Sequence, residues 1–247
     1  MVPQQKQEWF ETWFDSPYYH LLYQNRNENE ADQFVESLLS HLKLATESNV
    51  LDVACGTGRY SQSFAAHDFY VLGIDLSKKN ILQASCNESE HLTFFRHDMR
   101  ESFYVNYFDA AFNLFTSFGY FNNEKDNLKA IRALSNSLKI GGKLVIDFFN
   151  SKKVIAEIIQ EQQVFREGIQ FTIKKFLEEN VIVKKILIID GEKEFEFEER
   201  VQALQLQDFE RYFTANNLQV KNIFGDYQLH SFDPLKSERM ILIAEKI

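Results

Sequence analysis

The stretch LDVACGTGR at residues 51–59 joins an apolar run to two glycines that are separated by one threonine. The chain has only nine glycines, so the placement of Gly56 and Gly58 here indicates a requirement of the backbone. Glycine reaches positive φ and lets another group approach the main chain closely. In an open parallel sheet, ligands bind beyond the carboxyl ends of the strands, where such turns lie. The stretch therefore predicts a ligand site at the end of a buried strand.

From this stretch as far as residue 150, apolar runs alternate with helical patterns. Strands are expected at 49–54, 69–75, 91–98, 107–115 and 141–149. Helices are expected between them at 59–67, 77–85 and 124–138. Strands that alternate with helices in this way are typical of βαβ units. The sequence therefore predicts an α/β fold, a Rossmann-like and mostly parallel sheet that is flanked by helices.

The segment before this core has a different composition and spacing of apolar residues. Residues 1–45 are crowded with aromatic side chains and have helical spacing, with a break at Pro17. We expect this segment to form a helical lid region over a ligand-binding core at residues 49–150. Nothing in the composition separates the two, so residues 1–247 are taken as a single domain.

The segment after the core changes to a period of two. Residues 162–203 alternate apolar and polar side chains, which predicts three antiparallel strands with one solvated face. The turns between them are expected near Asn180 and at Asp190-Gly191. A closing helix and the final strands are expected in residues 204–247, so the three strands form an antiparallel β insertion.

The composition excludes several classes of protein. The formal net charge of −9 argues against non-specific binding to nucleic acid, and no apolar run approaches the roughly 20 residues of a membrane span. Cys55 and Cys86 form no CxxC pair, and no histidine cluster has ligand spacing, so no metal is expected. The beginning MVPQQKQEWF does not resemble a secretion signal, which with the unpaired cysteines predicts a cytoplasmic location.

Three residues narrow the choice of ligand. A dinucleotide fingerprint has a third glycine or alanine where this chain has Ser61. Asp52 lies four residues before Gly56, where a carboxylate repels phosphates but accepts from an ammonium group. Asp75 ends the next strand, where a carboxylate holds both hydroxyls of a ribose, in NAD as well as in S-adenosylmethionine. Asp52 and Ser61 therefore favour S-adenosylmethionine over NAD.

The stretch LDVACGTG, together with GID after the second strand and HDM after the third, resembles the class I S-adenosylmethionine-dependent methyltransferases. Their first motif is D/E-x-G-x-G-x-G, and Asp52, Ala54, Gly56 and Gly58 occupy its positions, with alanine in place of the first glycine. Glycine and sugar N-methyltransferases carry similar sequences. The resemblance covers roughly residues 19 to 150 and, as topology, the closing strands.

The resemblance implies S-adenosylmethionine as the cofactor and carries a role to each matching position. Asp52 would lie near the amino group of the methionine part, against which the backbone of 54–58 would pack. Asp75 would hold the ribose, with Leu76 against the adenine. The other implied cofactor-binding residues are Asp98 and Met99 at the adenine, Asn113, Leu114 and Phe115 near the sulfonium, and Tyr19 and Arg26 from the N-terminal segment.

The methyl acceptor is less well defined by the sequence. Methyl transfer is a direct displacement that depends on alignment and exclusion of water, so no catalytic residue is required and none is predicted. Tyr18, Tyr19, Tyr23 and Tyr120 offer flat apolar faces that suit a small-molecule acceptor. The possible proton acceptors are His20 and His230, with Asp147 and Asp226 as weaker candidates. The β insertion could cover the acceptor or form a homodimer contact.

Alternatives remain open at this point. SPYY at residues 16–19 partly matches the Pro-Pro-aromatic motif of nucleic-acid methyltransferases but lacks the second proline and a basic stripe. A nicotinamide-dependent dehydrogenase is disfavoured by Asp52 and Ser61. A non-catalytic protein that binds S-adenosylmethionine would keep the same acidic residues and glycines. The preferred hypothesis is a small-molecule methyltransferase that has no nucleic-acid and no membrane partner.

Overall fold

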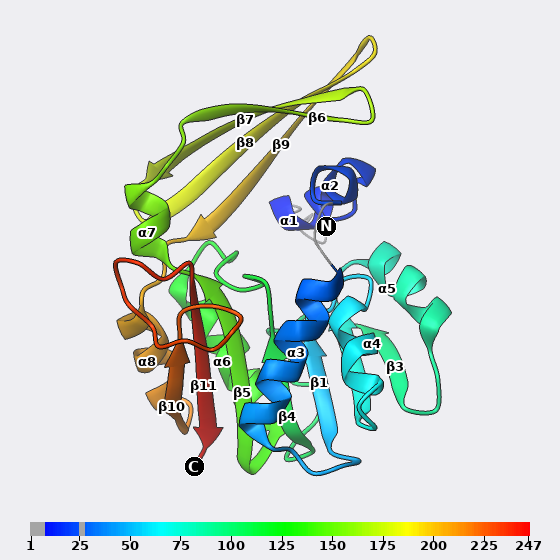
Figure 1. The fold of residues 1–247 in the computed structure, drawn as a ribbon, viewed down its shortest axis with the longest axis vertical. Coiled ribbons are helices and arrows are strands. Elements are labelled where there is room, and N and C mark those ends of the chain that lie inside the picture. Colours follow the sequence, from blue (N-terminus) through cyan, green and yellow to red (C-terminus); the bar gives the residue numbers. More distant parts are fainter. Residues whose placement is uncertain (1–7, 25–27) are drawn as a thin grey trace, which may run out of the picture.

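The computed structural model describes residues 8–24 and 28–247, with side chains from residue 31 onward in the second range, and its strands form two sheets (Figure 1). The larger sheet has seven strands in the order β10-β11-β5-β4-β1-β2-β3. Their bounds are β1 (Asn49–Val53), β2 (Tyr70–Asp75), β3 (Leu92–Arg96), β4 (Phe108–Asn113), β5 (Leu138–Phe149), β10 (Leu218–Phe224) and β11 (Arg239–Lys246). Strands β1 to β5 pair in parallel, and β11 is antiparallel to both β5 and β10. The predicted Rossmann-like, mostly parallel sheet is confirmed.

Helices cover both faces of this sheet (Figure 1). One face carries α3 (Glu28–Leu42), α4 (Arg59–Ala65), α5 (Lys78–Ala84) and the short η1 (Ser85–Asn87). The other face carries α6 (Glu124–Ser137) and α8 (Leu206–Thr214). In β1, Val50 packs with the first set of helices and Leu51 and Val53 with the second. Because both faces are buried, the strand has the continuous apolar run that the sequence shows.

The strand order reverses between β1 and β4. The chain proceeds from β1 to β2 and β3 on one side, and returns to β4 and β5 on the other. At such a switch point the loops diverge from the carboxyl ends of neighbouring strands and leave a crevice. The turns after β1, β2, β3 and β4 all border this place.

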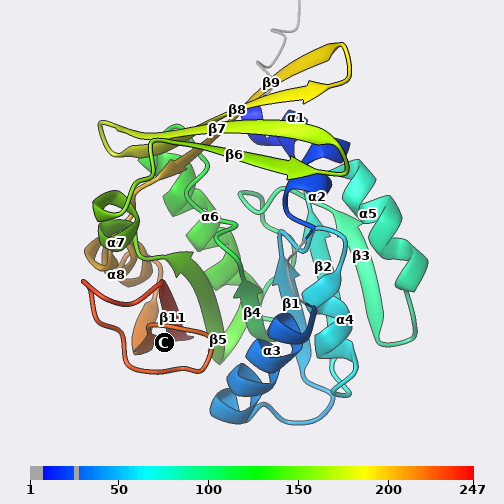
Figure 2. The same cartoon turned by 45° about the horizontal axis from the view of Figure 1, so that its top comes forward.

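The second sheet is antiparallel and has the order β6-β7-β8-β9. Its strands, which follow α7 (Ser151–Ala156), are β6 (Glu161–Arg166), β7 (Ile169–Glu178), β8 (Val181–Asp190) and β9 (Lys193–Gln202). The antiparallel insertion is confirmed, but it has four strands and not three. The sequence pattern missed β6 because four of its six side chains are exposed, so no apolar alternation marks it. This sheet extends over the carboxyl edge of the larger one (Figure 2).

Two short helices, α1 (Trp9–Trp13) and α2 (Pro17–Leu22), lie between the two sheets (Figures 1 and 2). Pro17 occupies the first turn of α2, where its missing N–H costs nothing, and the Ser16 hydroxyl accepts from the Tyr18 N–H. On one side Trp13 and Leu22 pack against the second sheet. Across the described residues 8–24 and 28–247, no helix has the length and apolar character to cross a membrane.

Candidate functional site

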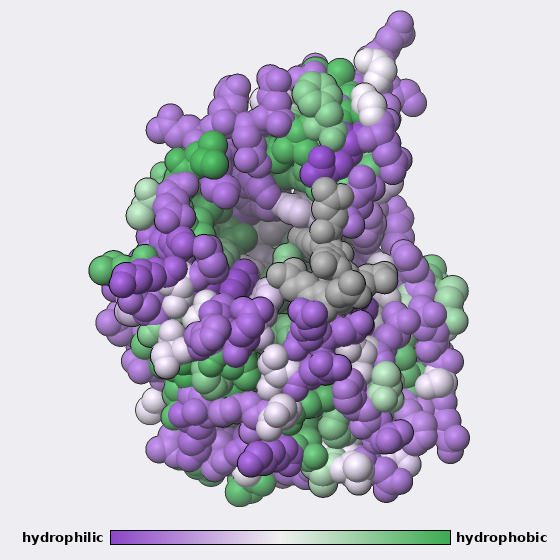
Figure 3. Space-filling model, viewed as in Figure 1, coloured by the Kyte–Doolittle hydropathy of each residue, from purple (hydrophilic) through white to green (hydrophobic). Residues whose placement is uncertain are grey.

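A cavity of about 800 Å³ opens at the switch point, and a smaller one of about 60 Å³ adjoins it. The space-filling view is hollowed between the second sheet and the body of the larger one (Figure 3). Three parts of the chain line the large cavity: the carboxyl edge of the parallel sheet, the segment of α1 and α2, and the inner face of the second sheet. Ala54 and Asp75 line both cavities, so the two cavities adjoin each other at these residues.

The turn after β1 uses left-handed backbone at three positions. Ala54, Gly56 and Gly58 have φ of 57°, 57° and 85°. A Cβ added to Gly56 would meet nothing within 4 Å, and Gly56 lines the large cavity. A Cβ at Gly58 would lie 2.6 Å from Phe94 Cζ, so this glycine is required by packing against β3. Ala54 bears the strain of about 1–2 kcal/mol that a side chain has in this conformation.

Asp75 connects the turn after β1 to the turn after β2. The Gly56 N–H donates to its Oδ2 at 2.9 Å, and the Ser77 N–H donates to its Oδ1 at 2.8 Å. Burial raises the pKa of this carboxyl, although these hydrogen bonds oppose the shift. Each carboxylate oxygen has more than one acceptor position. Asp75 can therefore accept two further donors from a ligand in the cavity.

Asp52 is a nearly completely buried carboxyl group, 2% exposed, on the wall of the large cavity. The Ser61 hydroxyl donates to its Oδ2 at 2.5 Å. Burial raises the pKa of Asp52 to about 7, against the opposing effect of the Ser61 hydrogen bond. A cationic ligand group beside Asp52 would favour the ionised form. Ser61 occupies the position of the third glycine of a dinucleotide site, and here its hydroxyl group holds the Asp52 carboxyl by a hydrogen bond.

The smaller cavity lies beside the ends of β2 and β3 and is lined by Leu76, Asp98 and Met99. The Arg100 side chain donates to both carboxylate oxygens of Asp98, from Nε at 3.1 and 3.0 Å and from Nη2 at 2.7 Å. Burial acts to raise the pKa of Asp98, but the hydrogen bonds and charge of Arg100 hold it below its usual value. The centroid of the Phe121 ring lies 4.8 Å from Arg100 Cζ. Phe121 forms an apolar slot together with Leu76 and Met99.

The loop after β4 forms another wall. Leu114 and Phe115 line the large cavity. Asn113 is fully buried, and its amide donates to the Val53 and Ser117 carbonyls, both at 3.2 Å. Asn113 therefore ties the end of β1 to this loop.

Phe115 and Thr116 are both left-handed, with φ of 58° and 61°, and β5 holds them in place. The Phe115 N–H donates to Asp147 Oδ2 and the Thr116 N–H to the Asp147 carbonyl, both at 2.8 Å. Asp147 is fully buried and accepts from Arg239 Nε at 2.7 Å, and Arg239 Nη2 reaches Thr116 Oγ1 at 2.9 Å. Two consecutive strained residues persist where their surroundings fix them in this way. Asp147 thus shapes the wall of the cavity.

The remaining predicted residues are on the N-terminal segment, in the loop after β4 and in the closing loops. Tyr19, His20, Tyr23 and Tyr120 line the large cavity, and Arg26 lies outside the described residues. Tyr18 donates to Asp190 at 2.8 Å at the end of β8. The second histidine candidate is elsewhere: His230 is exposed and its ring contacts Asp226 at 2.8 Å.

Sequence reasoning missed most of the second sheet's contribution. Lys175, Ile182, Lys184, Glu199 and Val201 line the large cavity. The alternation in IQFTIKKF places Lys175 on the same face as Phe171 and Ile173, which was a usable signal. It does not reveal where along the strand that face leaves the core and meets a cavity.

The chain is similar to methyltransferases in sequence and in fold. Residues 50–142 match the family model described as a methyltransferase domain. A putative methyltransferase of Bacillus subtilis (strain 168) is 33% identical over 121 residues, 48% of this chain and 49% of that relative. The dTDP-3-amino-3,4,6-trideoxy-alpha-D-glucopyranose N,N-dimethyltransferase of Streptomyces venezuelae is 28% identical over 132 residues, 52% of this chain and 54% of that relative. The alignments thus span about half the length of the curated relatives.

Solved structures extend the similarity to nearly the whole fold. A S-adenosylmethionine-dependent methyltransferase from Clostridium acetobutylicum ATCC 824 has a TM-score of 0.78 at 20% identity, over 93% of this chain and 96% of that one. CalS10, an amino pentose methyltransferase from Micromonospora echinaspora that was solved with S-adenosylmethionine bound, has a TM-score of 0.70 at 20% identity, over 94% and 98%. At these identities the likeness concerns the fold, which includes the second sheet.

Proposed function

We propose that the chain is a class I S-adenosylmethionine-dependent methyltransferase and that it transfers the methyl group of this cofactor to a small-molecule acceptor. The match of residues 50–142 to a methyltransferase domain and the similarity in fold to solved methyltransferases support the proposal. S-adenosylmethionine would supply an electrophilic methyl carbon: the acceptor's lone pair would form the new bond, the carbon–sulfur electron pair would stay on sulfur, and any proton on the attacking atom would pass to solvent. The products are the methylated acceptor and S-adenosylhomocysteine. The observation that carries the proposal is a pair of carboxyls, the buried Asp52 and the half-buried Asp75, that line the large cavity at the switch point.

The described residues supply a complementary group for each part of the cofactor. Asp52 would face the amino group, and the left-handed turn at Gly56 leaves its N–H engaged and its α-carbon open to the methionine part. Asp75 would accept from the ribose hydroxyls. The apolar slot of Leu76, Met99 and Phe121 would receive the adenine, beside the Asp98 carboxylate.

The chain contributes to the reaction by alignment and by exclusion of water. Holding two reactants in line replaces a bimolecular encounter, which is worth several kcal/mol of the barrier. The cavity is covered on one side by α1 and α2 and on another by the second sheet. Its volume of about 800 Å³ lies within the roughly 300–1,000 Å³ of small-molecule sites, which favours a small acceptor beside the cofactor. Aromatic faces such as Tyr19 and Tyr120 suit the cationic sulfonium.

Thermal unfolding with S-adenosylmethionine, S-adenosylhomocysteine and NAD tests the cofactor. A ligand at about 100 times its dissociation constant adds about 2.7 kcal/mol of stability. We expect the first two ligands to raise the melting temperature and NAD to leave it unchanged. Stabilisation by NAD alone would refute the proposal.

Transfer itself needs a separate measurement. Protein incubated with methyl-labelled S-adenosylmethionine and a metabolite extract should release S-adenosylhomocysteine and label a small molecule. Tight cofactor binding without any labelled product, from extracts of several growth conditions, would support the non-catalytic alternative. Label that appears only on added RNA or DNA would support the nucleic-acid alternative.

A further inference from the structure

A row of charged side chains crosses the inner face of the second sheet where this face lines the large cavity. Lys175 on β7 is paired with Lys184 on β8, which is paired with Glu199 on β9. Directly opposite residues of antiparallel strands project to the same face. All three residues line the large cavity. Further along the same face the side chains are apolar and pack on α1 and α2: Phe171, Ile173, Ile186, Ile188, Phe195 and Phe197.

The row has one more positive charge than negative. Lys184 and Glu199 form an ion pair at 3.3 Å, and each side chain is only 16% exposed. Glu199 Oε1 also accepts from the Trp13 indole and the Tyr23 hydroxyl, both at 2.7 Å. These hydrogen bonds hold the segment of α1 and α2 to β9 of the second sheet. The carboxylate of Glu199 therefore already has three partners, Lys184, Trp13 and Tyr23, and none of them is Lys175.

Lys175 has no ion-pair partner of its own. Among the described residues, no carboxylate lies within ion-pair distance of its ammonium. Burial, and then the neighbouring charge of Lys184, lower the pKa of Lys175, and the charge of Glu199 opposes this shift without cancelling it. Both effects penalise the protonated form, and an anion beside the ammonium would remove this penalty.

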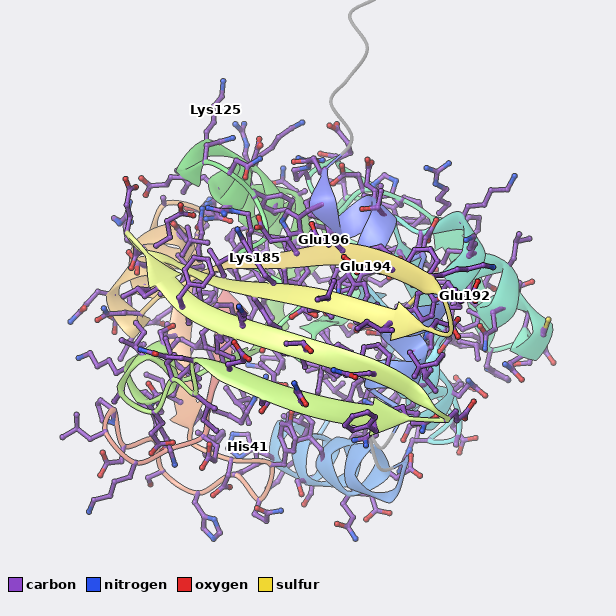
Figure 4. All side chains as sticks on the ribbon, turned by 90° about the horizontal axis from the view of Figure 1, so that it is seen from above. His41, Lys125, Lys185, Glu192, Glu194 and Glu196 are labelled. Carbon is purple, nitrogen blue, oxygen red and sulfur yellow. The ribbon has the colours of Figure 1, made fainter. Side chains whose placement is uncertain are left out.

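The next row of the same strands provides a contrast. Lys174, Lys185 and Glu198 are paired one residue further along and project to the outer face. Seen from above, the outer face carries Lys185 beside the acidic side chains of Glu194 and Glu196 (Figure 4). Lys174 is 61% exposed and has Glu161 at 3.3 Å. Lys185 on the outer face has no ion pair among the described residues either, but it is exposed to solvent, whereas Lys175 is half-buried and lines the cavity.

We propose that Lys175, with Lys184 beside it, binds an anionic oxygen group, a carboxylate or a phosphate, on the methyl acceptor. This inference rests on the proposed function, because the cofactor would occupy the end of the cavity at Asp52 and Asp75 and leave the end at the sheet to the acceptor. The substrate class is then an anionic small molecule. Its charged group lies under the second sheet, and its nucleophilic atom reaches toward the sulfonium.

Titration with simple anions tests the inference without knowledge of the acceptor. Acetate, inorganic phosphate and pyrophosphate are titrated by calorimetry into the protein saturated with S-adenosylhomocysteine. We expect at least one to bind, and Lys175→Met to weaken that binding by about tenfold or more, the value of one lost charge-assisted contact. Lys174→Met removes the same charge from the outer face and is expected to leave the affinity unchanged. Lys175→Arg should keep most of it.

The outcomes separate this inference from the proposed function. Binding of S-adenosylhomocysteine is measured for each variant and reports an intact fold and cofactor site. If the wild-type complex binds none of the three anions, or if Lys175→Met and Lys174→Met change the affinity equally, the inference is wrong and the methyltransferase proposal stands. If S-adenosylhomocysteine does not bind the wild-type protein, the proposed function fails, and the anion titration of the free protein still decides the role of Lys175. A preference for acetate or for the phosphates identifies the anionic group.

Discussion

The two surfaces that face each other across the large cavity are built differently. At the carboxyl edge of the parallel sheet, the main chain fixes the site: Asp75 is held by the N–H groups of Gly56 and Ser77. On the inner face of the second sheet, cross-strand side chains such as Lys184 and Glu199 form the surface on a regular backbone. Side chains on a regular strand can be exchanged without altering the fold, whereas a turn cannot. The first surface therefore suits the proposed cofactor, and the second suits the proposed acceptor.

The comparison is tested most strongly at Asp147, which holds the left-handed residues Phe115 and Thr116 at the carboxyl edge of the parallel sheet. Asp147→Asn leaves Arg239 without its buried counter-charge, and we expect the free energy of unfolding to fall by about 3–5 kcal/mol. The matched control is Asp109→Asn on β4, whose partner Lys139 is 43% exposed, with an expected loss of up to about 1 kcal/mol. Urea denaturation measures both. Equal losses would show that the wall does not depend on the buried pair.

The second test removes the proposed hold on the ribose. Asp75→Asn should weaken binding of S-adenosylhomocysteine by about 10²-fold, because hydrogen bonds to a charged group contribute about 1.5–3 kcal/mol. The control is Asp68→Asn, an exposed aspartate before the other end of β2. It should bind as the wild type does in calorimetry. An affinity of Asp75→Asn within threefold of the wild type would remove Asp75 from the cofactor site.

Asp75 and Asp147 also show how much of the site could be predicted from the sequence. Asp75 is predictable because it ends one strand pattern, and the strand before it in the chain ends in a glycine turn. The need for glycine at Gly58 comes from Phe94 on β3, and the strained turn at Phe115 depends on Arg239 of the last strand. Such contacts join residues far apart in the chain, so no local pattern contains them. The alternation of apolar residues separates Lys175 from Lys174 by face, but it does not show where along β7 the inner face meets the cavity.

The third test applies to the second sheet. Glu199→Gln weakens the charge-assisted contacts with Trp13, Tyr23 and Lys184, which hold the segment of α1 and α2 to the second sheet, and we expect a loss of about 2 kcal/mol in the free energy of unfolding. Glu198→Gln, the adjacent change on the outer face, should cost less than about 1 kcal/mol. If the two variants are equally stable, the contacts of Glu199 do not hold α1 and α2 to the second sheet.

The smallest expected effect concerns the charge of Asp52 and is seen as a dependence on pH. Since its pKa is raised to about 7 in the folded protein, the proton is bound below that pH. Asp52 therefore contributes stability at low pH that is lost as the pH rises through about 7. An ammonium group of the ligand reverses the preference, because it binds the ionised form.

Affinity for S-adenosylhomocysteine should accordingly rise about tenfold between about pH 6 and pH 8, as Asp52 loses its proton without a ligand. In Asp52→Asn the rise should disappear, and the affinity should stay near the low-pH value of the wild type. Asp75 also has a raised pKa, and its charge contributes to the raised pKa of Asp52, so the ratio of the two proteins' affinities reports Asp52 together with this coupling. Calorimetry at several pH values provides that ratio. A rise of the same size in Asp52→Asn would mean that the amino group of the cofactor lies elsewhere and that the buried carboxyl of β1 serves only the Ser61 contact.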